Sequence, residues 1–239
     1  MKMLIAANWK MHGAMDWIKK PVHFDTVLPA KDRKAIDVLI CPPALYLAAM
    51  VEPAMDNNVF IGAQDCHAAD EGAHTGDISA KQIAETGARY VINGHSERRA
   101  NGETDANVKA KAEAALRHAL TPIICVGETL DQRESGEAQA VVAKQLSGSL
   151  PEVEGKSFVV AYEPVWAIGT GKTATPSDIA DMHNFIRTIV GPDTRILYGG
   201  SVKPANAAAI FAVETVNGAL IGGAGLDMYS LADIAQAAL

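Results

Sequence analysis

The strongest constraint on the fold is a repeated pattern of eight short apolar runs, which are separated by longer amphipathic or alanine-rich stretches. Apolar runs of this length are typical of buried strands, and the stretches between them are typical of helices. Their alternation predicts successive βα units and therefore a parallel sheet. We expect strands at residues 3–9, 37–41, 59–64, 90–94, 121–128, 157–163, 195–200 and 218–223.

Two of the intervening stretches have clear helical patterns. Residues 105–120 and 175–190 are predicted to form long helices, and the second has Pro176 and Asp178 near its start, where these residue types are favoured. The stretch after the first strand is weaker because Pro21 interrupts it. We expect only a short or broken helix there.

Eight βα units within 239 residues predict an α/β fold in which one closed parallel (β/α)8 barrel spans residues 1–239 as a single domain. A hydrophobic content of 49% is enough for a large core. The alternative is an open doubly wound sheet, which normally carries a glycine-rich turn after its first strand. No such turn follows residues 3–9.

Composition narrows the range of partners and compartments. The net charge of −7 disfavours nucleic acid, because binding phosphate backbones needs a basic face. The first residues lack the apolar region of a signal peptide, and no run reaches the length of a membrane span. Cys41, Cys66 and Cys125 lie far apart, which argues against a disulfide framework. We therefore expect a cytoplasmic protein that binds neither nucleic acid nor membrane.

Polar residues or paired glycines occur just past most of the predicted strands. In a parallel barrel the reactive groups gather at the carboxyl ends of the strands, so these residues are the candidates for a shared site. They are Asn8, Lys10, Gln64, His95, Ser96, Glu97, Glu128, Glu163, Ser201, Gly222 and Gly223.

The segment 161–178 contains a Gly-Lys-Thr that suggests a nucleotide P-loop. A P-loop needs a glycine five residues before the glycine that precedes the lysine, and Trp166 stands at that position. We therefore predict no P-loop. Gly169 and Gly171 still permit close backbone approach to a single phosphate, and a plain surface loop is the other interpretation.

Five motifs in a fixed order carry a family resemblance: ANWKM at 7–11, GHSERR at 94–99, AYEPVWAIGTGK at 161–172, YGGSV at 198–202 and IGGAGL at 221–226. Together they resemble the triosephosphate isomerase family over essentially the whole chain. The resemblance implies a TIM barrel and a cofactor-independent isomerase. Its reaction is the interconversion of D-glyceraldehyde 3-phosphate and dihydroxyacetone phosphate in glycolysis and gluconeogenesis.

The resemblance also implies catalytic roles. Moving a proton between neighbouring carbons requires a base, and Glu163 at the end of a strand suits that task. The enediolate formed carries negative charge on oxygen and needs waiting donors. His95 is the implied electrophile, as a neutral imidazole beside a helix N-terminus. Lys10 and Asn8 complete the catalytic set, and Ser96 and Glu97 support it, with Glu97 neutralising Lys10.

The implied phosphate-binding residues are Gly169, Ser201, Gly222 and Gly223, which present backbone N–H groups from the last loops of the barrel. Gly169 is also the implied tip of a lid over the substrate. No cofactor or metal is expected. A metal site built from Cys66, His67 and His74 is the alternative, but that spacing resembles no usual ligand set.

The segment from Cys66 to Ile78 is the predicted partner surface. In the resembled family this loop docks into a second subunit, with Thr75 here approaching the partner's Asn8 and the partner's His95. We therefore expect a homodimer.

Three departures from the family pattern are His12, Asp65 and Gly225. None touches the proposed proton-transfer groups, and they bear on phosphate affinity and on the dimer contact around His12.

Two other functions remain open at this point. One is an aldose–ketose isomerase of larger sugar phosphates, which needs a roomier pocket on the same barrel. The other is a catalytically silent phosphate-binding or scaffold protein. The presence of Asn8, Lys10, His95 and Glu163 together argues against the silent protein.

Overall fold

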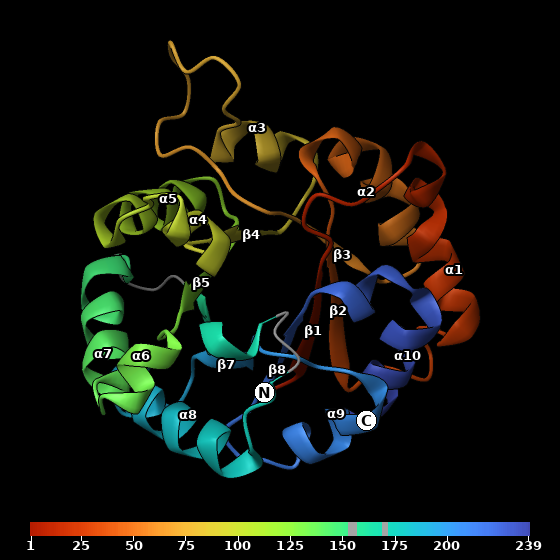
Figure 1. Cartoon of the computed structure of the whole chain (residues 1–239). Helices are drawn as coiled ribbons and strands as arrows, with labels where there is room; N and C mark the ends of the chain where they lie inside the picture. Colours follow the sequence, from red (N-terminus) through yellow and green to blue (C-terminus); the bar gives the residue numbers. More distant parts are fainter. Residues whose placement is uncertain (153–156, 169–171) are drawn as a thin grey trace.

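The computed structural model describes residues 1–152, 157–168 and 172–239. Its strands form a closed barrel in sequence order, each parallel to the next, with β8 returning to pair with β1 (Figure 1). The predicted parallel barrel is confirmed. The strands are β1 (Met3–Asn8), β2 (Ile36–Cys41), β3 (Phe60–Ala63), β4 (Tyr90–Asn93), β5 (Thr121–Val126), β6 (Val159–Tyr162), β7 (Arg195–Tyr198) and β8 (Gly218–Ile221).

Helices surround the barrel on its outside (Figure 1). Those of the described residues are α1 (Lys20–Val27), α2 (Leu47–Asp56), α3 (Ala80–Glu85), α4 (Ser96–Ala100), α5 (Asp105–Arg117), α6 (Leu130–Glu134), α7 (Ala138–Ser149), α8 (Pro176–Val190), α9 (Pro204–Phe211) and α10 (Met228–Gln236). Short 3-10 turns are η1 (Met15–Lys19), η2 (Ala44–Tyr46), η3 (Val165–Ala167) and η4 (Gly223–Leu226). In the part of the chain that the structure covers, no helix is both long and apolar enough to cross a membrane.

The helix predictions are confirmed with small differences. Helices α5 and α8 begin at reciprocal capping boxes, in which Thr104 and Thr175 accept hydrogen bonds from the third helical residue. After β1, the chain forms η1 and then the eight-residue α1, with Pro21 in its first turn. Proline is tolerated there because the first N–H groups of a helix have no intrahelical partner.

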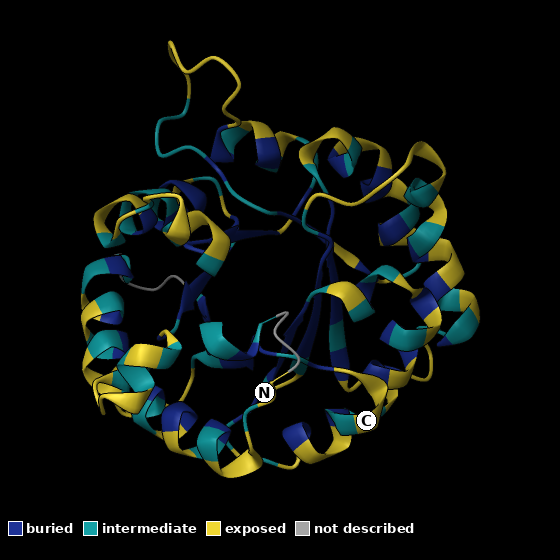
Figure 2. Cartoon of the chain, in the orientation of Figure 1, coloured by how far each residue is buried: buried dark blue, intermediate teal, exposed yellow. Residues whose placement is uncertain are grey.

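Alternation along the strands divides the core into two layers. Side chains of one parity, such as Leu4, Ala6, Val159 and Ala161, fill the barrel interior. Those of the other parity, such as Ile5, pack against the surrounding helices. Figure 2 shows the strands buried and the helices exposed only on their outer faces. This packing makes the barrel a rigid support for groups at its ends.

Burial of one histidine predicts how stability depends on pH. The His183 ring of α8 is fully buried beside the Tyr162 and Tyr198 rings, with centroid distances of 5.9 and 6.5 Å. Burial lowers its pKa from 6.5 to about 4. At this histidine the unfolded chain therefore binds more protons than the folded chain between about pH 4 and pH 6.5, and stability falls as the pH falls through this range. We expect this group to remove about 2 kcal/mol of unfolding free energy between about pH 7 and pH 5.

The measurement is urea denaturation at both pH values and at one protein concentration. Other groups also titrate in this range, so the comparison is with His183→Gln, which cannot be protonated. The loss on acidification should be smaller in the variant by about 2 kcal/mol. An equal loss in both proteins would show that His183 does not contribute to the pH dependence.

Candidate active site

Strand parity directs two polar side chains to the carboxyl end of the barrel. Asn8 follows Leu4 and Ala6 on the inward face of β1, and Glu163 continues the inward face of β6 after Ala161. Only 5% of Asn8 and 2% of Glu163 is exposed. On β1 and after β6, the first polar residue that follows the inward-facing apolar side chains therefore lies at the mouth of the barrel.

The Glu163 carboxylate is bound by two residues that follow β4. Its Oε1 lies 3.0 Å from Nε2 of His95, and its Oε2 accepts a hydrogen bond of 2.8 Å from the Ser96 backbone N–H. Two glycines make room for this residue. A Cβ at Gly127 would lie 1.8 Å from the Glu163 carbonyl oxygen, and one at Gly199 would lie 2.8 Å from its Cγ. The carboxylate is thus held in one position by two donors and tight backbone walls.

His95 caps the short helix α4. Its Nδ1 accepts a 3.2 Å hydrogen bond from the Glu97 backbone N–H, so the neutral ring carries its proton on Nε2, facing Glu163. Burial lowers the pKa of His95, but the Glu163 carboxylate and then Glu97 raise it by more, so the net shift is upward. Separating Glu163 from the ring removes the main upward cause. Burial and the helix N-terminus then favour the neutral imidazole.

Lys10 has a strained backbone at the end of β1. Its φ is 51°, in the left-handed region that non-glycine residues rarely occupy. Two hydrogen bonds hold it: the Lys10 N–H donates to Asn8 Oδ1 at 3.0 Å, and Gln64 Nε2 donates to the Lys10 carbonyl at 2.7 Å. Its Nζ lies 2.6 Å from Glu97 Oε1. Strain retained in this way is typical of functional sites, and here it positions a cation at the barrel mouth.

A cavity of about 240 Å³ brings the candidates together. Asn8, Lys10, His95 and Glu163 line it, together with Ser201, Gly222 and Gly223 from the ends of β7 and β8. Ser96 and Glu97 do not line the cavity but contact residues that do: the Ser96 N–H donates to Glu163, and Glu97 pairs with Lys10. Gly169 lies outside the described residues.

Two residues at the barrel mouth differ from the sequence prediction: Lys203, which was not predicted, and Glu128, which was predicted to join the site. Lys203 also lines the cavity, and the available signal was a lysine directly after the YGGSV motif. Glu128 follows β5 as expected, but it is fully buried away from the cavity. Its Oε1 accepts hydrogen bonds from Tyr162 and Trp166 and pairs with Arg133, so it anchors the turn after β6.

The histidines near Cys66 are arranged differently from the metal alternative that the sequence raised. Cys66 is buried and its Sγ donates to the Lys111 carbonyl. The ligand atoms of His67, His74 and Asp77 lie within 4.8 Å of one another, at the base and along the exposed part of the loop after β3.

Comparison with known proteins identifies the family. The family model described as triosephosphate isomerase matches residues 3–238. The chain belongs to the triosephosphate isomerase family. Family members named triosephosphate isomerase include those of Hyphomonas neptunium, 50% identical over 94% of both chains, and Ruegeria pomeroyi, 51% identical over 99% of this chain and 97% of that protein.

A solved structure supports the same assignment. The crystal structure of triosephosphate isomerase from Bartonella henselae has a TM-score of 0.88, 40% sequence identity and 99% coverage of both chains. Membership of the triosephosphate isomerase family thus agrees with the closed parallel barrel of the structure.

Proposed function

We propose that this chain interconverts D-glyceraldehyde 3-phosphate and dihydroxyacetone phosphate by proton transfer through an enediolate. The observation that carries the proposal is the pairing of Glu163 with His95, at 3.0 Å, in a cavity that also contains Lys10. A base, an electrophile and a cation then surround one small substrate. Carbon acid chemistry of this kind needs no resident cofactor.

Glu163 takes the proton from carbon. Its carboxylate is buried and accepts hydrogen bonds from the Ser96 N–H and from His95 Nε2. In the proposed reaction the carboxylate leaves these donors and moves toward the reacting carbon of the substrate. As Glu163 leaves His95, the Nε2–H becomes available to the substrate oxygen. Release of the base and exposure of the electrophile are therefore one movement. The carboxyl group exchanges this proton with solvent before it protonates the neighbouring carbon, while the hydroxyl proton passes from one substrate oxygen to the other through His95 Nε2.

His95 and Lys10 stabilise the charge that develops. A neutral imidazole donates one hydrogen bond to the enediolate oxygen, and the Lys10 ammonium supplies positive charge beside it. Lys10 also approaches the phosphate end, since a Cβ on Gly222 would lie 3.7 Å from Lys10 Cε. Ser201, Gly222 and Gly223 hold the phosphate in this proposal.

The size of the cavity favours a three-carbon substrate. Its volume of about 240 Å³ lies below the range of roughly 300–1,000 Å³ that is usual for larger ligands. A coupled assay on the purified chain with triose, tetrose and pentose phosphates tests this. We expect rapid turnover of the triose phosphates only. Equal turnover of a pentose phosphate would favour the larger-sugar isomerase, and no turnover would favour a silent binding protein.

The proposal includes a homodimer through the loop Cys66–Ile78, in the cytoplasm where glycolysis occurs. This loop extends away from the barrel between β3 and α3 (Figure 1), and residues 71–78 are all exposed. Beside its base lies a cavity of about 390 Å³ that includes Lys10 and Met11. Met11 is 95% exposed, which is unusual for a large apolar side chain. In the dimer, the loop of each chain fills this cavity of the other and braces Lys10.

The dimer predicts the effect of a change at Thr75. Thr75→Arg adds a long charged side chain to the exposed part of the loop and should yield monomers. Turnover should fall by about 100-fold, the usual cost of displacing catalytic groups by about 1 Å. Sedimentation velocity and the coupled assay measure the two effects. Thr75→Ser keeps the hydroxyl and is the matched control. A fully active monomer at micromolar concentration would refute the proposed role of the loop.

A further inference from the structure

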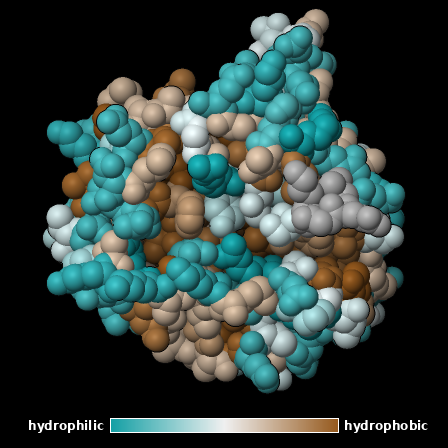
Figure 3. Space-filling model, turned by 180° about the vertical axis from the view of Figure 1, so that it is seen from behind, coloured by the Kyte–Doolittle hydropathy of each residue, from teal (hydrophilic) through white to brown (hydrophobic). Residues whose placement is uncertain are grey.

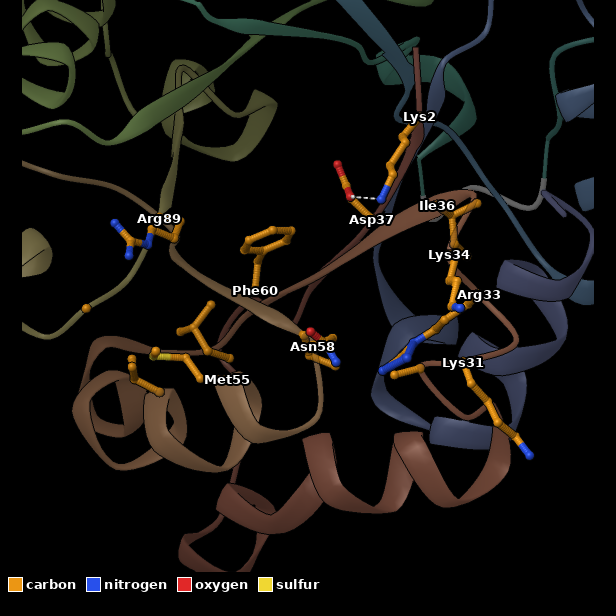
Figure 4. Close-up of a pocket in the computed structure, with 15 residues that line it drawn as sticks. Lys2, Lys31, Arg33, Lys34, Ile36, Asp37, Met55, Asn58, Phe60 and Arg89 are labelled. Atoms are coloured by element: carbon orange, nitrogen blue, oxygen red, sulfur yellow. Dashed lines mark ion pairs between the residues drawn. The ribbon is translucent and has the colours of Figure 1, made fainter.

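A large cavity lies at the other end of the barrel from the proposed active site. It has a volume of about 640 Å³ and is formed where β2, β3 and β4 begin. Figure 4 shows its lining, which comes from the α1–β2 connection, the end of α2 and the residues just before β4. A cavity of this size is large enough for a ligand well beyond a triose phosphate.

Its rim is cationic in a chain whose net charge is −7. Lys31, Lys34 and Arg89 are exposed and form no ion pair with any described residue. The one acid in the lining is Asp37, whose carboxylate is already shared by Lys2 at 3.8 Å and Arg195 at 2.8 Å. The cavity therefore has an excess of positive charge that the protein itself does not neutralise.

A buried guanidinium adds to this charge from within the wall. Arg33 is 3% exposed, and its Nη2 donates to Asp25 Oδ1 at 2.9 Å and to the Asn57 carbonyl. Its Nε and Nη1 have no hydrogen-bond partner among the described residues. Burial lowers the pKa of Arg33, which Asp25 offsets only in part. A cation held in this way gains from an anion bound in front of it.

The opposite wall of the cavity is apolar and accessible. Phe60 and Met55 are 37% and 63% exposed, and Val51 and Ile61 continue the same wall. One edge of Phe60 packs against Tyr90 with ring centroids 5.7 Å apart. In Figure 4 the Phe60 ring stands out from β3 between Arg89 and the side of the cavity that carries Lys34. The view from behind in Figure 3 shows hydrophobic surface interleaved with hydrophilic side chains.

We propose that this cavity binds a small organic phosphate carrying a planar ring, the chemical class of the mononucleotides. The ring of the ligand stacks on Phe60, and its phosphate is held by Lys31 and Lys34 in front of Arg33. Neither half of the ligand suffices alone, because the charged rim and the apolar wall belong to different sides of one cavity. The site is separate from the catalytic groups, which lie at the carboxyl ends of the strands.

Isothermal titration with adenosine monophosphate tests the site, with adenosine and inorganic phosphate as separated halves of the probe. We expect saturable binding of adenosine monophosphate with a Kd below about 1 mM. Lys31→Gln together with Lys34→Gln should weaken it at least about tenfold, since each loses a charge-assisted contact. Phe60→Leu should also weaken it while keeping the strand apolar. Adenosine and phosphate should each bind more weakly than the intact probe.

The matched control is Lys109→Gln together with Lys144→Gln, which removes two charges from α5 and α7 outside the cavity. It should leave the affinity for adenosine monophosphate unchanged, and both double variants should isomerise triose phosphates normally. Absence of binding, or equal affinity in the Lys31/Lys34 and control variants, would overturn the proposal. So would competitive inhibition of isomerisation, which would place the probe at the mouth of the barrel.

Discussion

Replacing Glu163 with glutamine will lower turnover by roughly 100- to 10,000-fold, the usual cost of losing a general base. The amide keeps the size and polarity of the side chain but cannot accept a proton from carbon. Its oxygen can still accept one of the present hydrogen bonds, from His95 Nε2 or the Ser96 N–H. The barrel and the affinity for the phosphate group should therefore change little. The coupled assay gives turnover, and circular dichroism reports the fold.

Two further variants sharpen this prediction. Glu163→Asp retains a carboxylate but withdraws it by one methylene, so its turnover should lie between those of the wild type and Glu163→Gln. Glu134→Gln changes an exposed glutamate of α6 and is the control for charge alone. Near-normal turnover in Glu163→Gln would assign the base to another group.

Replacing His95 with glutamine should lower kcat by about 100- to 1,000-fold, the effect expected when one donor to a developing oxyanion is removed. The change in KM should be much smaller, because the enediolate needs this donor more than the substrate does. The structure explains why no other group replaces it. The Nε2 of His95 faces Glu163 and is the nitrogen that can donate to the substrate. The other ring nitrogen, Nδ1, already accepts a hydrogen bond from the Glu97 N–H.

The control for His95→Gln is His23→Gln, an exposed histidine of α1 that lies outside the cavity. It should leave kcat unchanged. The kcat of His95→Gln should also lose any pH dependence that arises from protonation of the imidazole. A rise in KM of about 100- to 1,000-fold with unchanged kcat would show that His95 contributes only to binding of the substrate in its ground state.

The barrel was predictable because each strand is a short apolar run bounded by polar or turn residues. Seven strands fall within their predicted ranges, and β2 begins one residue early at Ile36. The parity that turns Asn8 and Glu163 inward was also present in the sequence, as inward positions two residues apart. The apolar pattern does not fix the exact ends of the strands, because residues such as Trp9 are buried without belonging to a strand.

The candidate site was predictable in composition but not in geometry. Family motifs pointed to His95, Lys10 and Glu163, whereas the resting pairing of His95 with Glu163 depends on side-chain positions from distant segments. Glu128 shows the limit of position alone. It follows β5 as the other candidates follow their strands, but Tyr162 and Trp166 bind it inside the wall. Likewise, the cationic cavity around Arg33 joins residues too far apart in sequence to form a motif.

The most direct test of the central claim follows the proton itself. The purified chain is incubated with dihydroxyacetone phosphate in deuterium oxide, and the product is examined by nuclear magnetic resonance. Proton transfer through an enediolate at Glu163 predicts deuterium at C2 of glyceraldehyde 3-phosphate. In Glu163→Gln, the rate of deuterium incorporation should fall by the same factor as turnover. Product formed at full rate without deuterium at C2, or unchanged incorporation in the Glu163→Gln variant, would contradict this mechanism.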